Sequence, residues 1–285
     1  MDQRGNTSSS TGTVKTGLIE VNGTSLYYEV RGSGPAVLFI PGALGDAGYF
    51  TQVAEELADE FSTVIYDRRG NSRSLRPPGW KMTSMDEQGD DAAGLLEALA
   101  LVPAVVYGNS IGAIIGLNLL LRYPHLLRGA MLHEPPLLSV LAHPETVIAM
   151  IQATIARGRE EGGPRGAVEA FLRAVGANID NLESAVRERM FLNSETFLGM
   201  EFLRFGVLPD DATLAAVTVP VQVLTGTHGQ PFRAEVAQWL AARLHVTPVV
   251  MPGGHTPQIE DSHLVAETIR PFLRRVCATT IPLEG

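Results

Sequence analysis

Residues 108–112 read Gly-Asn-Ser-Ile-Gly, a nucleophilic side chain with glycines two positions before and after it. The run before them, 104–107, is β-branched and aromatic like a buried strand, and residues 111–123 have apolar side chains at helical spacing. A serine on so sharp a strand-to-helix turn is held away from the backbone. The pattern predicts that Ser110 is a nucleophile and that the N–H of Ile111 faces a developing oxyanion. A helix-capping serine is the alternative, but it leaves the paired glycines unexplained.

A serine hydroxyl needs a base within hydrogen-bond reach. Of the seven histidines, His255 follows the last predicted strand in the run Pro-Gly-Gly-His-Thr-Pro, so its loop should lie at the same sheet edge as Ser110. His228, in the loop after the preceding strand, is the second candidate. A plain surface histidine would not favour the flanking glycines and proline.

The elements that must position these residues alternate between strands and helices, which predicts an α/β fold with a mostly parallel sheet and helices on both faces. In such a sheet, functional residues collect in loops at the carboxyl ends of the strands. The predicted strands span 17–21, 25–30, 36–40, 62–66, 104–107, 129–132, 219–224 and 248–251.

Strand patterns stop between residues 137 and 208, where the sequence is helical and rich in Phe and Met. We expect a helical cap inserted at 137–208, a core formed by 16–136 and 209–285, and a disordered lead at 1–15. Aromatic side chains in the cap could contact an apolar or aromatic substrate or simply pack the cap onto the core, and packing accounts for most of them. The predicted substrate contacts are Leu44, Phe191, Phe197 and Phe202.

The composition restricts the possible partners. A net charge of −9 argues against nucleic acid or an anionic membrane, and the single cysteine, Cys277, excludes an intrachain disulfide or thiolate zinc site. No apolar stretch reaches the length of a membrane span, no His/Asp/Glu cluster has metal-ligand spacing, and no dinucleotide-binding glycine motif follows the first strands. We therefore expect a cytoplasmic, cofactor-free protein that acts on a small molecule; a homodimer remains open.

Four segments together resemble the α/β-hydrolase superfamily: the turn at 108–112, the loop 41–45, the run 67–72 and the late Gly-Gly-His. The resemblance covers nearly all of 17–277 and implies an eight-stranded α/β-hydrolase fold. It also implies a serine–acid–histidine order and oxyanion donors on the backbone of Ile111 and Ala43. Asp67 and the arginines after it more plausibly shape a turn than do chemistry.

The expected acid is missing from its usual loop, since residues 225–232 contain no carboxylate. Glu134 ends the strand that follows the Ser110 helix, which in this superfamily lies between the Ser110 strand and the strand ending at Thr225. A carboxylate at that tip could orient the imidazole of His255. Alternatively, Glu134 is a solvated side chain, and the acid is Asp210, Asp211 or Asp261, which are less favoured candidates.

The strand 130–136, Ala-Met-Leu-His-Glu-Pro-Pro, resembles the corresponding strand of the zearalenone lactonases, fungal α/β-hydrolases that open a macrocyclic lactone. In that family the acid is a glutamate 24 residues after the serine, the spacing between Ser110 and Glu134 here. Residues 27–29, 44–45 and 252–255 look similar too. The cap departs from that family, whose cap carries a tryptophan that contacts the substrate. Here neither Trp80 nor Trp239 lies in the predicted cap.

The sequence thus predicts a serine hydrolase for esters or lactones. Thioester, carbon–carbon or perhydrolase chemistry at the same site is an alternative. A binding protein that kept the fold without catalysis is another, and it predicts that Glu134 is not hydrogen-bonded to His255.

Overall fold

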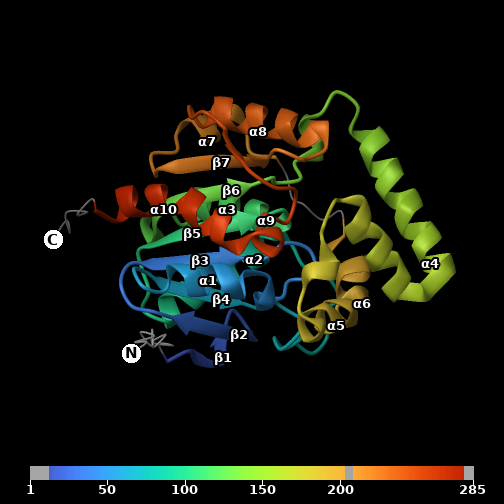
Figure 1. The fold of residues 1–285 in the computed structure, drawn as a ribbon, viewed down its shortest axis with the longest axis horizontal. Coiled ribbons are helices and arrows are strands. Elements are labelled where there is room, and N and C mark those ends of the chain that lie inside the picture. The colour runs from blue at the N-terminus through green and yellow to red at the C-terminus, as the bar shows by residue number, and fades with distance from the viewer. Residues whose placement is uncertain (1–12, 203–207, 279–285) are drawn as a thin grey trace, which may run out of the picture.

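The computed structural model describes residues 13–202 and 208–278, and its centre is an 8-stranded sheet in the order β1-β2-β4-β3-β5-β6-β7-β8 (Figure 1). β2 pairs antiparallel with β1 and β4, whereas β3 to β8 pair in parallel. The fold predicted from the sequence is therefore confirmed. The strands are β1 (Lys15–Val21), β2 (Thr24–Arg31), β3 (Ala36–Ile40), β4 (Ser62–Tyr66), β5 (Ala104–Asn109), β6 (Leu127–His133), β7 (Val221–Gly226) and β8 (Val249–Met251).

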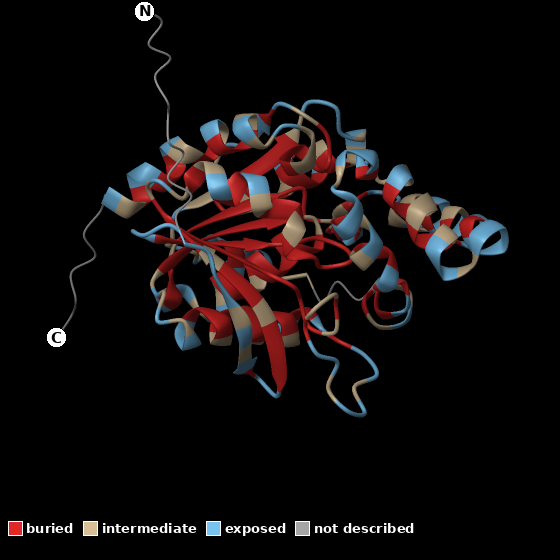
Figure 2. Cartoon of the chain, turned by 60° about the horizontal axis from the view of Figure 1, so that its bottom comes forward, coloured by how far each residue is buried: buried red, intermediate tan, exposed pale blue. Residues whose placement is uncertain are grey.

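The central strands β3, β4 and β5 are buried along their whole length, as their unbroken apolar sequence predicts (Figure 2). The hairpin turn between β1 and β2 has Asn22 and Gly23 at positive φ, 44° and 71°. β1 already begins at Lys15, so the last residue of the predicted disordered lead is in a strand. Residues 1–12 of that lead, residues 203–207 of the predicted cap and residues 279–285 lie outside the described ranges.

Helices cover both faces of the sheet, with α1 packed against α10 and α2 packed against α3. Ser84 caps α2 by accepting a hydrogen bond from the Glu87 N–H. A 3₁₀ turn, η1 (Ala47–Phe50), leads directly into α1. The core helices are α1 (Thr51–Leu57), α2 (Met85–Ala98), α3 (Ile111–Arg122), α7 (Asp211–Ala215), α8 (Pro231–Arg243), α9 (Pro257–Glu260) and α10 (Ser262–Ala278).

Between β6 and β7 the described chain is helical, and this segment lies beside the carboxyl ends of the parallel strands (Figure 1). We call residues 137–202 the cap segment; that it forms a separate unit remains a prediction. Gly162 and Gly163 have non-helical angles and kink its longest helix. The cap segment comprises α4 (Pro144–Ala174), α5 (Ser184–Leu192), α6 (Ser194–Thr196) and a π-helical turn, η5 (Phe197–Glu201), with short 3₁₀ turns at 138–140 and 179–181.

Several polar contacts fasten the cap segment to the core, among them the following three. Arg189 donates to Asp46 at 2.8 Å, Asn193 donates to the Leu44 carbonyl at 2.7 Å, and Arg68 pairs with Glu201 at 2.9 Å. In the described ranges, no helix is both long and apolar enough to cross a membrane.

Candidate active site

Ser110 occupies the sharp turn between β5 and α3 that the sequence predicted. Its backbone is in an unusual region, φ 56° and ψ −123°, and its side chain makes no capping hydrogen bond, which argues against the alternative of a helix cap. A Cβ at Gly112 would lie 2.1 Å from the Ile40 carbonyl oxygen, and one at Gly108 would lie 2.2 Å from the Gly112 oxygen. The paired glycines are therefore needed because strand and helix backbones touch here.

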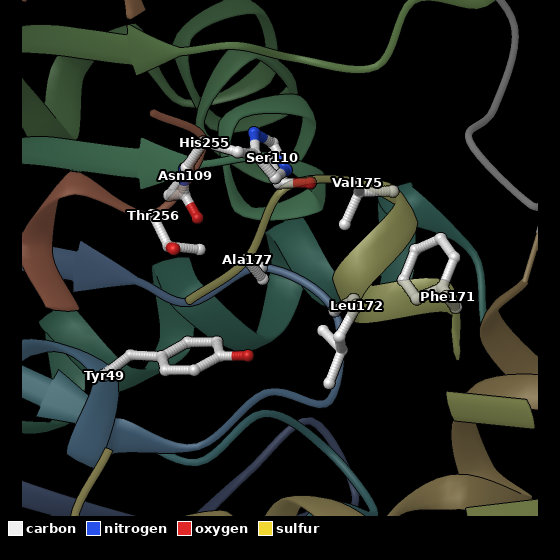
Figure 3. Close-up of a pocket in the computed structure, with 11 residues that line it drawn as sticks. Tyr49, Asn109, Ser110, Phe171, Leu172, Val175, Ala177, His255 and Thr256 are labelled. Atoms are coloured by element: carbon white, nitrogen blue, oxygen red, sulfur yellow. The ribbon is translucent and has the colours of Figure 1, made fainter. Parts of the chain in front are cut away.

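Ser110 and His255 together line two small cavities, of about 20 and 40 Å³. Figure 3 shows the serine side chain beside the imidazole, with residues of α4 across the cavity. The cap segment contributes apolar side chains to both cavities. The loop 41–45, Tyr49 and Asn109 complete the smaller cavity, and α8 contributes to the larger one.

Glu134 lies directly after β6, with φ 48° and a side chain that is fully buried. Its Oε2 is 2.7 Å from Nδ1 of His255. Its Oε1 accepts a hydrogen bond of 2.8 Å from the Gly226 N–H, at the end of β7. The end of β7 therefore contributes a donor that holds the carboxylate, close to where the superfamily's usual pattern would place the acid itself.

Arg233, in the first turn of α8, is a member of the site that sequence reasoning missed. Its Nη1 is 3.0 Å from Glu134 Oε2 and also lies against Nδ1 of His255, while its Nη2 donates to the Val175 carbonyl of the cap segment at 2.8 Å. The side chain is only 6 % exposed. The signal in the sequence is the position of this arginine directly after the loop 225–232, but an arginine cannot serve as the missing carboxylate.

The electrostatics favour an ionised glutamate beside a neutral imidazole. Burial lowers the pKa of His255, and the Arg233 cation lowers it further, against the opposing pull of Glu134. Burial raises the pKa of Glu134, but its hydrogen bond to His255, with the charges of His133, His255 and Arg233, outweighs burial and holds that pKa below its usual range. A neutral His255 is the form that can accept a proton.

Both predicted oxyanion donors adjoin the serine. Ile111 is the first residue of α3, so its N–H has no acceptor within the helix, and it lines the larger cavity. Ala43 lines the smaller cavity together with Gly42 and Ser110. A hydrogen-bond donor from each side of the serine is the arrangement that stabilises a tetrahedral oxyanion.

Of the predicted substrate contacts, Phe202 lines the larger cavity, and the other three are not among the lining residues of these two cavities. Phe197 packs between Phe171 and Phe202, and Phe191 lies under the Arg165 guanidinium, 4.1 Å from its ring centroid. Leu44 is buried, and its carbonyl accepts from the cap segment. Lining residues that sequence reasoning missed include Tyr49, Phe171, Val175 and Phe232.

The alternative acids and base have other roles. Asp210 caps α7, Asp211 pairs with Arg243, Asp261 accepts from the Leu264 N–H, and His228 is exposed. Asp67 accepts from Arg73 and from the Ala47 N–H, in keeping with the predicted structural turn. Among the described residues, no group of three or more His, Cys, Asp or Glu side chains could hold a metal ion.

Parts of the chain are similar in sequence to known hydrolases. Residues 35–161 match the model of the α/β-hydrolase fold family. The chain is 42 % identical over 129 residues to the uncharacterized hydrolase YraK of Bacillus subtilis, a match that covers 45 % of this chain and 48 % of that protein. It is 37 % identical over 118 residues to a zearalenone hydrolase of Bionectria ochroleuca, covering 40 % and 45 %. These matches thus span about half the length of the curated relatives.

Two solved structures have the same fold over nearly the whole chain. A thermophilic esterase from Thermogutta terrifontis superposes with a TM-score of 0.72 at 24 % identity, covering 92 % of this chain and 99 % of that one. A putative lipase from Acinetobacter baumannii superposes with a TM-score of 0.78 at 20 % identity, covering 94 % and 93 %. With the strand order and the serine turn between β5 and α3, these matches show that the chain has the α/β-hydrolase fold.

Proposed function

We propose that this protein hydrolyses a carboxylic ester or lactone, with Ser110 as nucleophile, His255 as base and Glu134 as the acid that orients the base. The observation that carries this proposal is the 2.7 Å contact between Glu134 and Nδ1 of an imidazole that shares both cavities with Ser110. That contact is the opposite of what a non-catalytic binding protein with a displaced Glu134 predicts. The names of relatives, hydrolases and an esterase among them, agree with the proposal.

The reaction follows from the positions of the groups. With Nδ1–H donated to Glu134, Nε2 of His255 takes the proton of Ser110 as Oγ attacks the carbonyl carbon. The N–H groups of Ile111 and Ala43 stabilise the oxyanion. The tetrahedral intermediate collapses, the C–O bond breaks, and the imidazolium gives its proton to the leaving alkoxide. Water, deprotonated by the same imidazole, then attacks the acyl-serine and releases the acid.

The cavities favour a compact substrate, because both are small and largely apolar. The smaller cavity, about 20 Å³, has the Tyr49 hydroxyl and Asn109 in its wall, and it is on the order of the space that one water needs. Burial raises the pKa of Tyr49, so its hydroxyl stays protonated and able to donate. The larger cavity, about 40 Å³, is lined by Leu138, Phe202 and Phe232 among other apolar groups. A macrocyclic lactone would therefore need the cap segment to move outward.

A panel of aryl acetates, small lactones, zearalenone, thioesters and β-diketones tests the reaction class. We expect ester or lactone turnover that Ser110→Ala abolishes, and we expect a fluorophosphonate to label Ser110 in the wild-type protein. Glu134→Gln should lower kcat by about 10³-fold or more, because the neutral amide no longer stabilises the imidazolium. Glu169→Gln, in an exposed ion pair with Arg173, is the matched control.

Retained turnover in Ser110→Ala would overturn the mechanism. Turnover of thioesters or β-diketones alone, again dependent on Ser110, would assign the other chemistry to the same site. A wild-type protein that neither turns over the panel nor reacts with the fluorophosphonate would favour a binding role.

A further inference from the structure

Arg68, at the carboxyl end of β4, is a buried cation whose contacts reach both the loop 41–45 and the cap segment. Its Nε donates to the Pro41 carbonyl at 3.0 Å, and its Nη2 donates to the Gly42 carbonyl at 2.8 Å. Its two terminal nitrogens form a forked pair with Glu201, each at 2.9 Å. The side chains of Arg68 and Glu201 both have 0 % exposure. The Ser110 reaction as described above uses neither of them.

The contact with Gly42 fixes the direction of a neighbouring N–H. In a planar trans peptide the C=O of one residue and the N–H of the next point in opposite directions. Arg68 and, at 3.2 Å, the Gly45 N–H both donate to the Gly42 carbonyl, so the Ala43 N–H is directed to the other side of that peptide. Gly42 and Ala43 both line the cavity that contains Ser110, and a Cβ on Gly42 would lie 3.1 Å from the Ser110 Cβ.

Glu201 makes this arrangement depend on the cap segment. It belongs to η5, and 133 residues separate it from Arg68 in the sequence. Asn71 also donates to Glu201 at 2.9 Å, and Gln88 accepts from Arg68 at 2.6 Å. A buried guanidinium without its carboxylate is costly, so losing Glu201 would destabilise this position of Arg68.

We propose that Arg68 and Glu201 form a clamp through which the docked cap segment orients the oxyanion donor at Ala43. The inference rests on the proposed function, and it makes Arg68 and Glu201 positioning residues. A cap segment that moves away from the core would withdraw Glu201 and release the Gly42 peptide. The site would then be competent for oxyanion stabilisation only with the cap segment docked.

Two variants separate positioning from stability. Arg68→Met with Glu201→Leu replaces the ion pair by apolar side chains, a change that buried pairs often tolerate. Arg68→Lys keeps a cation beside Glu201 but loses the forked donor set. For each variant and for wild type, we would measure kcat and KM on p-nitrophenyl acetate, and the melting temperature. A further measurement is inhibition by phenylboronic acid, whose tetrahedral adduct with the serine carries an anionic oxygen. Glu188→Gln breaks an exposed forked pair with Arg165 within the cap segment and is the control.

In the folded variants we expect kcat to fall about 10²-fold and KM to change by less than about 3-fold, because an oxyanion donor acts on the transition state. We expect the affinity for the boronic acid to fall in parallel. Glu188→Gln should match wild type. A folded variant with wild-type kcat and wild-type boronate affinity would overturn the clamp.

Fluorophosphonate labelling tells the two failures apart. A wild-type protein that is labelled at Ser110, with variants labelled at the same rate, overturns the clamp and leaves the proposed function standing. A wild-type protein that is neither labelled nor active overturns the proposed function and the clamp with it.

Discussion

Arg233 determines how the charges of Glu134 and His255 are arranged. An arginine has only donors, so it stabilises the carboxylate and disfavours a proton on the imidazole beside it. Its Nη1 lies against both Glu134 Oε2 and His255 Nδ1. For Nε2 to accept from Ser110, Nδ1 must carry its proton toward Glu134, and the ionised glutamate favours that tautomer. Arg233 thus keeps the base neutral and the acid charged.

Removing this cation should move the acidic limb of the pH profile. We expect Arg233→Met to shift the acidic limb of kcat/KM upward by roughly one pH unit, because a nearby positive charge lowers the pKa of His255. Arg233→Lys should shift it less, and Arg173→Met, in an exposed ion pair, should leave it unchanged. An identical limb in the folded Arg233→Met variant would contradict this role.

At the scale of elements, the turn from β5 to α3 shows what local sequence can predict. The glycines at 108 and 112 and the strand and helix around them are contiguous, so they identified Ser110 directly. Glu134 followed because β6 lies between β5 and β7, which the resemblance to a known strand order implied. Arg68 and Glu201 could not be paired, because nothing in either local sequence indicates a partner 133 residues away.

The close approach of these elements gives a prediction about stability. A Cβ at position 112 would overlap the Ile40 carbonyl, and backbone cannot move aside as a side chain can. We expect Gly112→Ala to lower the free energy of unfolding by about 3 kcal/mol, as overpacking does. Denaturant titration checks this. Gly199→Ala, at an exposed helical position with nothing within 4 Å, should change stability by less than about 1 kcal/mol. Equal effects of the two substitutions would refute the steric account.

For the whole molecule, folding buries histidines in their neutral form. His133 is fully buried, its Nδ1 lies 2.9 Å from Asn109 Nδ2, and burial lowers its pKa to about 4. In the unfolded chain a histidine binds a proton below about pH 6.5. Between these two values the unfolded state binds more protons than the folded state, so stability is full above the window and is lost as the pH falls through it.

This linkage can be measured as the pH dependence of urea unfolding. His133 alone should contribute a slope of up to ~1.4 kcal/mol per pH unit in that window. We expect His133→Asn to be less stable at neutral pH but to show a shallower loss of stability on acidification. His143→Gln is the control, because that side chain is 81 % exposed and folding changes its hydration little. An unchanged slope in His133→Asn would show that other groups control acid unfolding.

The order of the site groups along the chain bears on how its specificity could be re-engineered. Ala43, Ser110, Ile111 and Glu134 all precede the cap segment, whereas Arg233 and His255 follow it. A foreign cap segment grafted between β6 and β7 would leave the site groups that precede it on one uninterrupted stretch of chain. Only the junction before β7 would then have to be matched to the core. Because Arg68 is buried without any route to solvent, such a graft must bring its own carboxylate to the place of Glu201. Lid libraries that ignore this requirement should yield folded chimeras with poor turnover.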